Sequence, residues 1–347
     1  MSISKAGIGK STQSTIEKRL RIEHLIDQTA LSQNQLANGG DVVKGLTQTP
    51  KSLPARYFYN DHGSQLFEQI CELPEYYPTR TETAILQECA GAIALTTGPC
   101  ELVELGSGSS TKTRILLDAY NQSGYPLRYL PIDVSAGILE SSAKQLLANY
   151  PSLQVHALAS TYELALKQLF PAQLPSRMIC FIGSTLGNLT PQECDEFFSQ
   201  ITDALHIGDY FLLGIDLQKS KHLLEAAYND SQGVTAAFNL NILEHLNWRF
   251  KGNFDPNQFE HWAFYNETQH QIEMHLRSLR LQNVQLGAIN LTVELENGET
   301  ILTEISRKFD LKVMQLELQS RGLVPLQVWT DPKQWFGLLL CQLQPLE

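Results

Sequence analysis

The feature that most constrains the fold is a short apolar segment that runs directly into two glycines. Residues 101–110 read Glu-Leu-Val-Glu-Leu-Gly-Ser-Gly-Ser-Ser, and a second apolar segment, Tyr129-Leu-Pro-Ile-Asp133, follows. Gly106 and Gly108 lack a Cβ, so the backbone can turn tightly and approach a ligand, while the amides that open the next helix face it. The carboxylate of Asp133 would accept hydrogen bonds from ribose hydroxyls. This arrangement predicts a nucleotide-binding crevice.

The glycine segment by itself is compatible with three interpretations. A dinucleotide fingerprint places a third glycine or alanine where the helix packs on the strand, whereas Ser109, Ser110 and Thr111 occupy that stretch here. A strand, a Gly-x-Gly turn and a helix, followed by a strand ending in Asp133, suit S-adenosylmethionine (SAM) at least as well as NAD. A turn without a ligand is the third interpretation. The missing third glycine favours SAM over NAD.

Apolar segments recur along the middle of the chain at the spacing of a parallel sheet. Helix-compatible sequence separates each from the next, which is the pattern of an α/β doubly wound fold. The carboxyl ends of parallel strands form the binding edge of such a sheet, so Gly106, Asp133, Gly183 and Asp216 should lie near one crevice. The predicted strands are Leu102–Leu105, Leu127–Val134, Leu153–Leu158, Met178–Ile182 and Tyr210–Ile215.

Outside this repeat, the sequence predicts further helices and strands. Apolar residues recur at helical spacing in Ile16–Gln35, Thr81–Ala94 and Leu223–Trp248, and they alternate with polar residues in Leu291–Leu295 and Ile301–Ile305. The region from about residue 219 to 306 therefore breaks the βα rhythm. We interpret it as an inserted α+β lobe.

The last two apolar segments, Leu323–Val328 and Trp335–Leu343, are typical of the antiparallel hairpin that closes a methyltransferase sheet. The chain then divides into a tail and two larger parts. Residues 1–15, rich in Ser, Gly, Lys and Thr, are expected to form a flexible tail. We predict a substrate-binding lobe from residues 16–80 and 218–306, and a SAM-binding domain from residues 81–217 and 307–347.

Composition narrows the classes of partner. The 347 residues carry a formal net charge of -11, whereas proteins that bind nucleic acid or anionic membranes usually present a face rich in Lys and Arg. No segment has the length and apolarity of a membrane span, and the first ten residues lack the apolar region of a signal peptide. We therefore expect a cytoplasmic protein with a small-molecule ligand and without nucleic-acid or membrane partners; a monomer is plausible, but the sequence leaves the oligomeric state open.

The cysteines and histidines suggest no metal site. The six cysteines are scattered without a Cys-x-x-Cys pair, so they are expected to be reduced and buried. His245, His261, His270 and His275 gather in the inserted lobe, but their spacing is not that of a helical metal pair and no acidic residue completes a triad. Surface or packed histidines are the favoured interpretation.

Five further segments are distinctive in their order and spacing. The first reads Leu53-Pro-Ala-Arg-Tyr-Phe-Tyr-Asn-Asp-His-Gly-Ser-Gln-Leu-Phe67 and continues in Leu73-Pro-Glu-Tyr-Tyr-Pro-Thr-Arg-Thr-Glu82. The others are Glu104–Thr113, Asp133-Val-Ser, Phe181-Ile-Gly-Ser-Thr-Leu-Gly-Asn188 with Leu213–Asp216 and Ala226–Tyr228, and Thr303-Glu-Ile-Ser-Arg-Lys-Phe309. Together they resemble the histidine Nα-methyltransferase family, which trimethylates histidine to hercynine in ergothioneine biosynthesis. The resemblance extends over most of the chain and implies a Rossmann-like, class I SAM-dependent methyltransferase sheet.

The resemblance assigns one group of residues to the methyl donor. Gly106 and Lys112 match family positions near the methionine part of the donor, and Asp133 matches the ribose-binding acid. At the adenine side the family usually has Asp followed by an aromatic residue, whereas Thr161-Tyr162 stands here, which predicts a weaker hold on the donor. Tyr77 competes with Tyr76 for a further donor position. With two glycines of the crevice, the candidate donor residues are Tyr76, Gly106, Gly108, Lys112, Asp133, Thr161, Tyr162 and Gly183.

A second group matches the family's acceptor pocket. Asn188 and Tyr228 resemble residues that hold the substrate carboxylate, for which an amide N–H and a phenol O–H are suitable donors. Glu304 and Ser306 resemble residues that hold the imidazole; being two apart on a predicted strand, they project on one face. A carboxylate and a hydroxyl satisfy both ring nitrogens, which favours histidine over phenyl or indole side chains. Phe67, Thr235 and Met274 also match pocket positions.

Tyr59 is the candidate catalytic residue because it matches the position nearest the amine. The reaction that the resemblance implies is a direct displacement by the amine lone pair on the donor methyl, so positioning should supply most of the catalysis. The sequence does not identify a general base.

These residues predict a SAM-dependent Nα-methyltransferase that converts L-histidine to hercynine by three successive transfers, without a metal. Two alternatives remain open at this point: a relative that methylates another amino acid or an amine, and a catalytically silent SAM-binding protein, suggested by the departure at Thr161.

Overall fold

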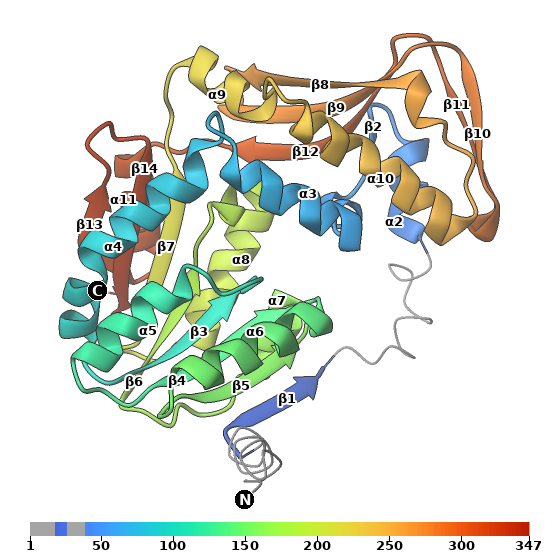
Figure 1. The fold of residues 1–347 in the computed structure, drawn as a ribbon. Coiled ribbons are helices and arrows are strands. Elements are labelled where there is room, and N and C mark those ends of the chain that lie inside the picture. The colour runs from blue at the N-terminus through green and yellow to red at the C-terminus, as the bar shows by residue number, and fades with distance from the viewer. Residues whose placement is uncertain (1–17, 26–38, 347) are drawn as a thin grey trace, which may run out of the picture.

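A mostly parallel sheet of eight strands forms the larger part of the molecule (Figure 1). The computed structural model describes residues 18–25 and 39–346. Along the sheet the strand order is β1-β5-β4-β3-β6-β7-β14-β13, in which β14 alone runs antiparallel to its two neighbours. The strands are β1 (Leu20–His24), β3 (Cys100–Leu105), β4 (Arg128–Asp133), β5 (Gln154–Ala159), β6 (Ser176–Phe181), β7 (Tyr210–Asp216), β13 (Leu323–Thr330) and β14 (Phe336–Leu343).

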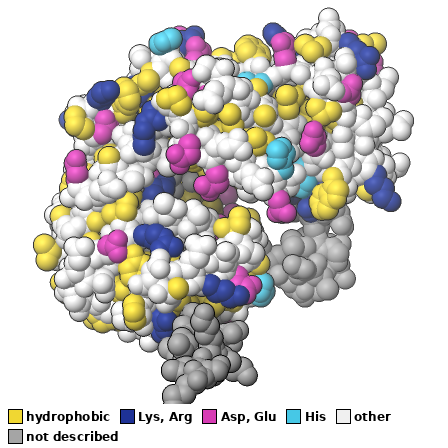
Figure 2. Space-filling model, in the orientation of Figure 1, with side chains coloured by type: hydrophobic (Ala, Val, Ile, Leu, Met, Phe, Trp, Pro, Cys, Tyr) yellow, Lys and Arg dark blue, Asp and Glu magenta, His cyan; other side chains and the backbone are white. Residues whose placement is uncertain are grey.

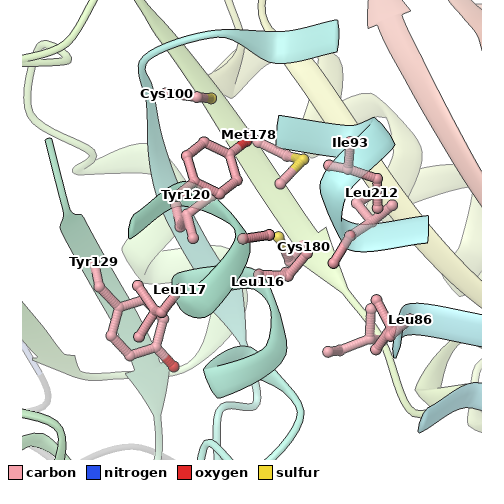
Figure 3. Packing of buried hydrophobic residues seen from close by; sticks show 14 of the residues in the cluster. Leu86, Ile93, Cys100, Leu116, Leu117, Tyr120, Tyr129, Met178, Cys180 and Leu212 are labelled. Atoms are coloured by element: carbon pink, nitrogen blue, oxygen red, sulfur yellow. The ribbon is translucent and has the colours of Figure 1, made fainter. Parts of the chain in front are cut away.

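Helices cover both faces of this sheet, which explains the unbroken apolar character of its central strands. Every residue of β3 and of β7 is buried, as expected for strands enclosed on both sides. One face packs on α4 (Tyr77–Thr97), α5 (Thr113–Gln122) and α6 (Ala136–Asn149), and Figure 3 shows side chains of α4 and α5 meeting those of β6 and β7. The other face packs on α7 (Tyr162–Lys167), α8 (Pro191–Ala204) and α11 (Leu311–Ser320).

A second lobe has its own sheet and its own core. Its strand order is β2-β12-β9-β8, and a separate hairpin pairs β10 with β11. Residues of β9 alternate between intermediate and buried positions, because only one face of this sheet is covered. Its strands are β2 (Lys51–Ser52), β8 (Phe259–Asn266), β9 (Gln271–Ser278), β10 (Gln282–Leu286), β11 (Leu291–Leu295) and β12 (Thr300–Arg307).

The helices of this lobe come from two distant parts of the chain. Helices α2 and α3 lie between β1 and β3 in the sequence, whereas α9 and α10 follow β7, and one hydrophobic cluster joins them. In Figure 1, α10 runs along the sheet of the lobe, with α3 beside it. The helical elements are α2 (Gly40–Thr47), η1 (Ala55–Phe58), α3 (Asp61–Glu72), α9 (Lys221–Tyr228), α10 (Val234–Phe250), η3 (Pro256–Gln258) and η4 (Gly287–Ile289); η2 (Thr185–Asn188) follows β6 in the large domain.

Most expected elements are confirmed, including the closing antiparallel hairpin of β13 and β14. The helix expected over Ile16–Gln35 is wrong at Leu20–His24, which forms β1 and pairs with β5 in parallel. This segment lies at the edge of the large sheet rather than in the lobe, because its alternate apolar side chains pack on the core of that sheet. The rest of that range and the predicted tail, residues 1–15, lie outside the described residues.

The helix expected over Leu223–Trp248 is interrupted between Asn229 and Gly233. Asp230 accepts hydrogen bonds from the amides of Gln232, Val234 and Thr235, and so closes the start of a new helix. Gly233 adopts a left-handed conformation (φ 73°) that favours glycine.

After β7 the chain leaves the large sheet and returns to it at the same place. The amide of Phe309 donates to the carbonyl of Asp216 (2.9 Å), and the amide of Gln218 donates to the carbonyl of Phe309 (3.0 Å). The end of β12 therefore lies beside the end of β7, which brings the lobe's sheet against the binding edge of the large sheet. Within the described ranges, no helix is both long and apolar enough to cross a membrane.

Candidate active site

The glycine turn after β3 is built for a close approach to a ligand. Gly106 and Gly108 have positive φ angles of 72° and 47°, which L side chains rarely adopt. A Cβ on Gly106 would lie 2.6 Å from the Tyr162 hydroxyl, whereas a Cβ on Gly108 would meet no atom within 4 Å. The amide of Gly108 donates to Asp133 Oδ2 (3.0 Å), so the turn and the predicted ribose acid are joined directly.

The adenine side holds the two residues that depart from the family pattern. Thr161 is exposed and precedes α7, while the Tyr162 ring packs edge-on against Phe181 (5.7 Å between centroids) and reaches back over Gly106. Burial raises the pKa of the Tyr162 phenol above its ordinary value, so it stays neutral. Tyr162 therefore covers the glycine turn.

Two buried hydroxyls beside this turn have no hydrogen-bond partner among the described residues. They belong to Ser107 and to Ser160, whose amide donates to the Asp133 carbonyl. Buried polar groups are usually satisfied, so unpaired hydroxyls next to a ribose-binding acid fit a polar ligand such as SAM. The residues present thus fit the donor that the sequence predicts.

A buried carboxylate that the sequence reasoning missed completes this side. Glu82 of α4 is fully buried, accepts two hydrogen bonds from the Gly183 amide (2.8 and 2.9 Å) and pairs with Lys112. Gly214 lies so close to it that a Cβ there would collide with the carboxylate. The signal was present in the sequence, because the neighbours of Glu82 on its helix face, Ile85 among them, are apolar.

The acceptor residues come together in a narrow pocket of the second lobe. Glu304 on β12 lies opposite Met274 on β9 in the register of the sheet, and a bulge between Leu302 and Glu304 precedes it. Helices supply the remaining walls. The pocket is lined by Phe67, Ile70, Tyr76, Ala227, Tyr228, Thr235, Phe238, Met274 and Glu304.

Tyr76 lies in this pocket rather than at the glycine turn. Its ring packs edge-on against Tyr228 (6.2 Å between centroids), and it precedes the first residue of α4. The competing residue, Tyr77, is buried and donates to Asp216 Oδ2 (2.6 Å). The structure therefore groups Tyr76 with the acceptor residues, contrary to its expected place at the donor. Helix α4 connects both sides, with Tyr76 at its start and Glu82 further along.

Glu304 carries a perturbed carboxyl group. Burial raises its pKa to about 7, and the positive charge of Lys308 opposes this rise. Near physiological pH the Glu304 side chain is thus present both as a carboxylate, which accepts hydrogen bonds, and as a neutral carboxylic acid. Ser306, two residues along the same strand, lies on the same side, because its hydroxyl accepts a hydrogen bond from Tyr228 at 2.8 Å.

Asn188 lies outside the pocket lining, at a tight contact between the two lobes. It ends η2, and a Cβ on the preceding Gly187 would lie 2.9 Å from the carbonyl oxygen of Arg307 and 3.5 Å from Ser306 Oγ. Glycine is therefore needed for η2 to pack on β12. This places Asn188 beside the end of the strand that carries Glu304 and Ser306.

Tyr59 lies at the rim of the acceptor pocket. Its ring packs edge-on against Phe67 and Phe238, at 5.9 and 5.8 Å between centroids. Although 46% of its surface is exposed, surrounding protein desolvates the phenol and raises its pKa, so the neutral form prevails at physiological pH. A neutral phenol can orient an amine but is a poor proton acceptor.

Two histidines of the lobe hydrogen-bond to backbone carbonyls, and a third, His270, is exposed. His245 Nδ1 lies 2.8 Å from the Tyr57 carbonyl, and His261 bridges Asn239 and the Tyr228 carbonyl. Burial lowers the pKa of both imidazoles. In the part of the chain that the structure describes, no group of three metal-ligating side chains gathers.

Acidic and basic side chains both occur on the face of the molecule drawn in Figure 2, where they are interspersed.

Comparison with known proteins agrees with this geometry. Residues 38–343 match the model of a family described as histidine-specific methyltransferase, SAM-dependent. The chain belongs to this family. It is 45% identical to histidine N-alpha-methyltransferase of Mycolicibacterium smegmatis over 86% of this chain and 93% of the relative. It is 42% identical to the enzyme of the same name from Mycobacterium tuberculosis, over 88% and 94% of the two chains.

A more distant member of the comparison acts on a different amino acid according to its name. The 4-dimethylallyltryptophan N-methyltransferase of Claviceps purpurea is 27% identical over 84% of this chain and 90% of its own. The large sheet of the present chain has the strand order and the antiparallel β14 of class I SAM-dependent methyltransferases. The predicted fold class is thus confirmed.

Proposed function

We propose that this family member trimethylates the α-amino group of L-histidine to give hercynine, the first step of ergothioneine biosynthesis, with SAM as the methyl donor. The observation that carries this proposal is that Glu304 lines a pocket walled by aromatic side chains, while Ser306, two residues along β12, is hydrogen-bonded to Tyr228 of the same pocket. An imidazole offers one N–H and one bare nitrogen, which a carboxylate and a hydroxyl can satisfy together. The names of the two mycobacterial relatives support the same substrate.

In the proposed complex, Gly106, Gly108, Lys112, Asp133 and Gly183 hold SAM, together with Thr161 and Tyr162 at the adenine. When bound, SAM supplies an electrophilic methyl group. We place Tyr76 with the acceptor residues Phe67, Asn188, Tyr228, Thr235, Met274, Glu304 and Ser306, because it lines the same pocket.

The chain's contribution to the reaction is to hold the amine in line with the donor. Tyr59 stands at the rim of the pocket, where its neutral hydroxyl can accept a hydrogen bond from the amine and turn the nitrogen lone pair outward. The substrate amine must lose its proton before each transfer. Because the phenol of Tyr59 is neutral, that proton passes to water.

The experiment that tests this proposal combines product analysis with binding. The purified protein is incubated with L-histidine and SAM, and mass spectrometry follows the appearance of mono-, di- and trimethylated histidine. Calorimetric titration compares histidine with phenylalanine and tryptophan. Trimethylated product and selective binding of histidine support the proposal.

Two other results point elsewhere. Methylation of tryptophan in preference to histidine would favour a substrate like that in the name of the Claviceps relative. Binding of S-adenosylhomocysteine without methylation of any amino acid would indicate a silent SAM-binding protein.

A further inference from the structure

A buried cation lies directly behind the acceptor pocket. Lys308 lies two residues after Ser306 and four after Glu304, and 3% of its surface is exposed. Its Nζ lies 3.0 Å from Asp216 Oδ2, 2.8 Å from Ser306 Oγ and 3.1 Å from Tyr228 Oη. The three N–H groups of the ammonium therefore have three acceptors, and none is left for a substrate.

The ammonium is held in its charged form. Burial favours the neutral amine, but Asp216 and Tyr228, with the hydrogen bonds to both, together outweigh it and raise the pKa of Lys308 above its ordinary value. The charge also lies over the ring of Tyr228, with Nζ 5.0 Å from the centroid. Lys308 is thus a fixed donor across the physiological pH range.

The hydrogen bonds that reach Ser306 determine the direction of its own proton. A serine oxygen has two lone pairs and one hydrogen. Tyr228 donates to Ser306 Oγ at 2.8 Å, and Lys308 donates to the same atom at 2.8 Å. Both lone pairs are then occupied, so the Ser306 hydroxyl can form a further hydrogen bond only as a donor.

We propose that Lys308 is a positioning residue that fixes Ser306 as the hydrogen-bond donor of the acceptor pocket, opposite Glu304 as the acceptor. This inference rests on the proposed function and specifies how the pocket distinguishes one substrate ring from another by its hydrogen bonds. A neutral imidazole satisfies both groups. An imidazolium presents a second N–H that Ser306 cannot accept, an indole has no bare nitrogen, and a ring without nitrogen leaves both groups unpaired.

Lys219 provides a matched control for the test. It is also buried and pairs with the other oxygen of Asp216 (2.5 Å), but it bonds to Tyr77 rather than to Tyr228 or Ser306. Lys219→Met therefore removes a cation from the same carboxylate without touching the pocket. A loss caused by damage to the buried ion pair alone should be the same in Lys308→Met and Lys219→Met.

The experiment measures kcat/KM for histidine and for 2-thienylalanine, an analogue whose ring has no nitrogen, in the full-length protein. The readout is the ratio of the two values. In Lys308→Met we expect this ratio to fall about tenfold, the scale of one lost hydrogen bond, with unchanged affinity for S-adenosylhomocysteine. In Lys219→Met the ratio should stay within about twofold of the wild type. In a Ser306→Ala background, Lys308→Met should add little, because its effect passes through that hydroxyl.

A second variant covers the case in which Lys308→Met does not fold. Tyr228→Phe removes the other donor to Ser306 and buries no new charge, so it should lower the same ratio. An unchanged ratio in the folded variants, or an equal fall in Lys219→Met, would overturn the inference. A wild-type protein that methylates no histidine would instead refute the proposed function.

Discussion

Gly106→Ala should damage the donor site more than Gly108→Ala, although both glycines occupy the left-handed region. An alanine at either position carries strain of about 1–2 kcal/mol from its positive φ. At Gly106 the new Cβ would also lie 2.6 Å from the Tyr162 hydroxyl. The ring must then leave its edge-on contact with Phe181, which costs a further ~1 kcal/mol. We expect Gly106→Ala to lower the free energy of unfolding by about 2–3 kcal/mol.

A second substitution separates the backbone strain at Gly106 from the steric clash with Tyr162. Removing the hydroxyl by Tyr162→Phe leaves Cζ as the nearest atom to the new Cβ, at 3.5 Å, an ordinary contact. The double variant Gly106→Ala/Tyr162→Phe should therefore be nearly as stable as Gly108→Ala, after correction for Tyr162→Phe alone. Urea unfolding measures stability, and calorimetric titration with S-adenosylhomocysteine measures the donor site, where Gly106→Ala should lose about tenfold in affinity. Equal losses at the two glycines, or no rescue by Tyr162→Phe, would refute the reasoning.

Three further predictions concern the carboxylates and the phenol of the site. Glu304→Gln should stabilise the ligand-free protein at pH 8 but not at pH 4.5, because a carboxyl with a pKa raised to about 7 destabilises the fold only when ionised; thermal unfolding at both pH values checks this. Glu82→Ala should lower the free energy of unfolding by about 3 kcal/mol and weaken S-adenosylhomocysteine binding, since the Gly183 amide and Lys112 lose their partner; urea unfolding and calorimetry measure both. Tyr59→Phe should lower kcat for histidine while leaving the melting temperature unchanged, because no hydrogen bond to that hydroxyl exists among the described residues. An unchanged kcat, or a lowered melting temperature, would contradict its role.

The sequence predicted the large sheet well because its strands are recognisable one at a time. Enclosed strands such as β7 are continuous apolar runs, and the glycines at Gly106 and Gly108 mark the turn after β3. The strand β1 was mistaken for part of a helix, since Leu20 and Ile22 also fit a helical spacing when they are taken together with Ile16, Leu25 and Ile26. This segment forms a strand because it pairs with β5, more than a hundred residues away, and the spacing of nearby residues does not indicate such a pairing.

The acceptor side shows where sequence reasoning stopped short. The alternation that placed Glu304 and Ser306 on one face also places Lys308 there, but a lysine at the end of a strand is normally expected in solvent. Its partner, Asp216, lies in another lobe and comes close only because β12 returns beside β7. Tyr76 was similarly misplaced, because its distance from the glycine turn depends on the packing of α4 and not on its sequence neighbours.

The junction between Leu217 and Phe309 also bears on how the chain can fold. These residues form a parallel bridge, although roughly ninety residues separate them, and closing a flexible loop of that length carries an entropic penalty that grows with the logarithm of its length. A lobe that folds first brings its own two ends together. Once these ends are together, docking of the hairpin of β13 and β14 on β7 carries only the entropic penalty of a short turn.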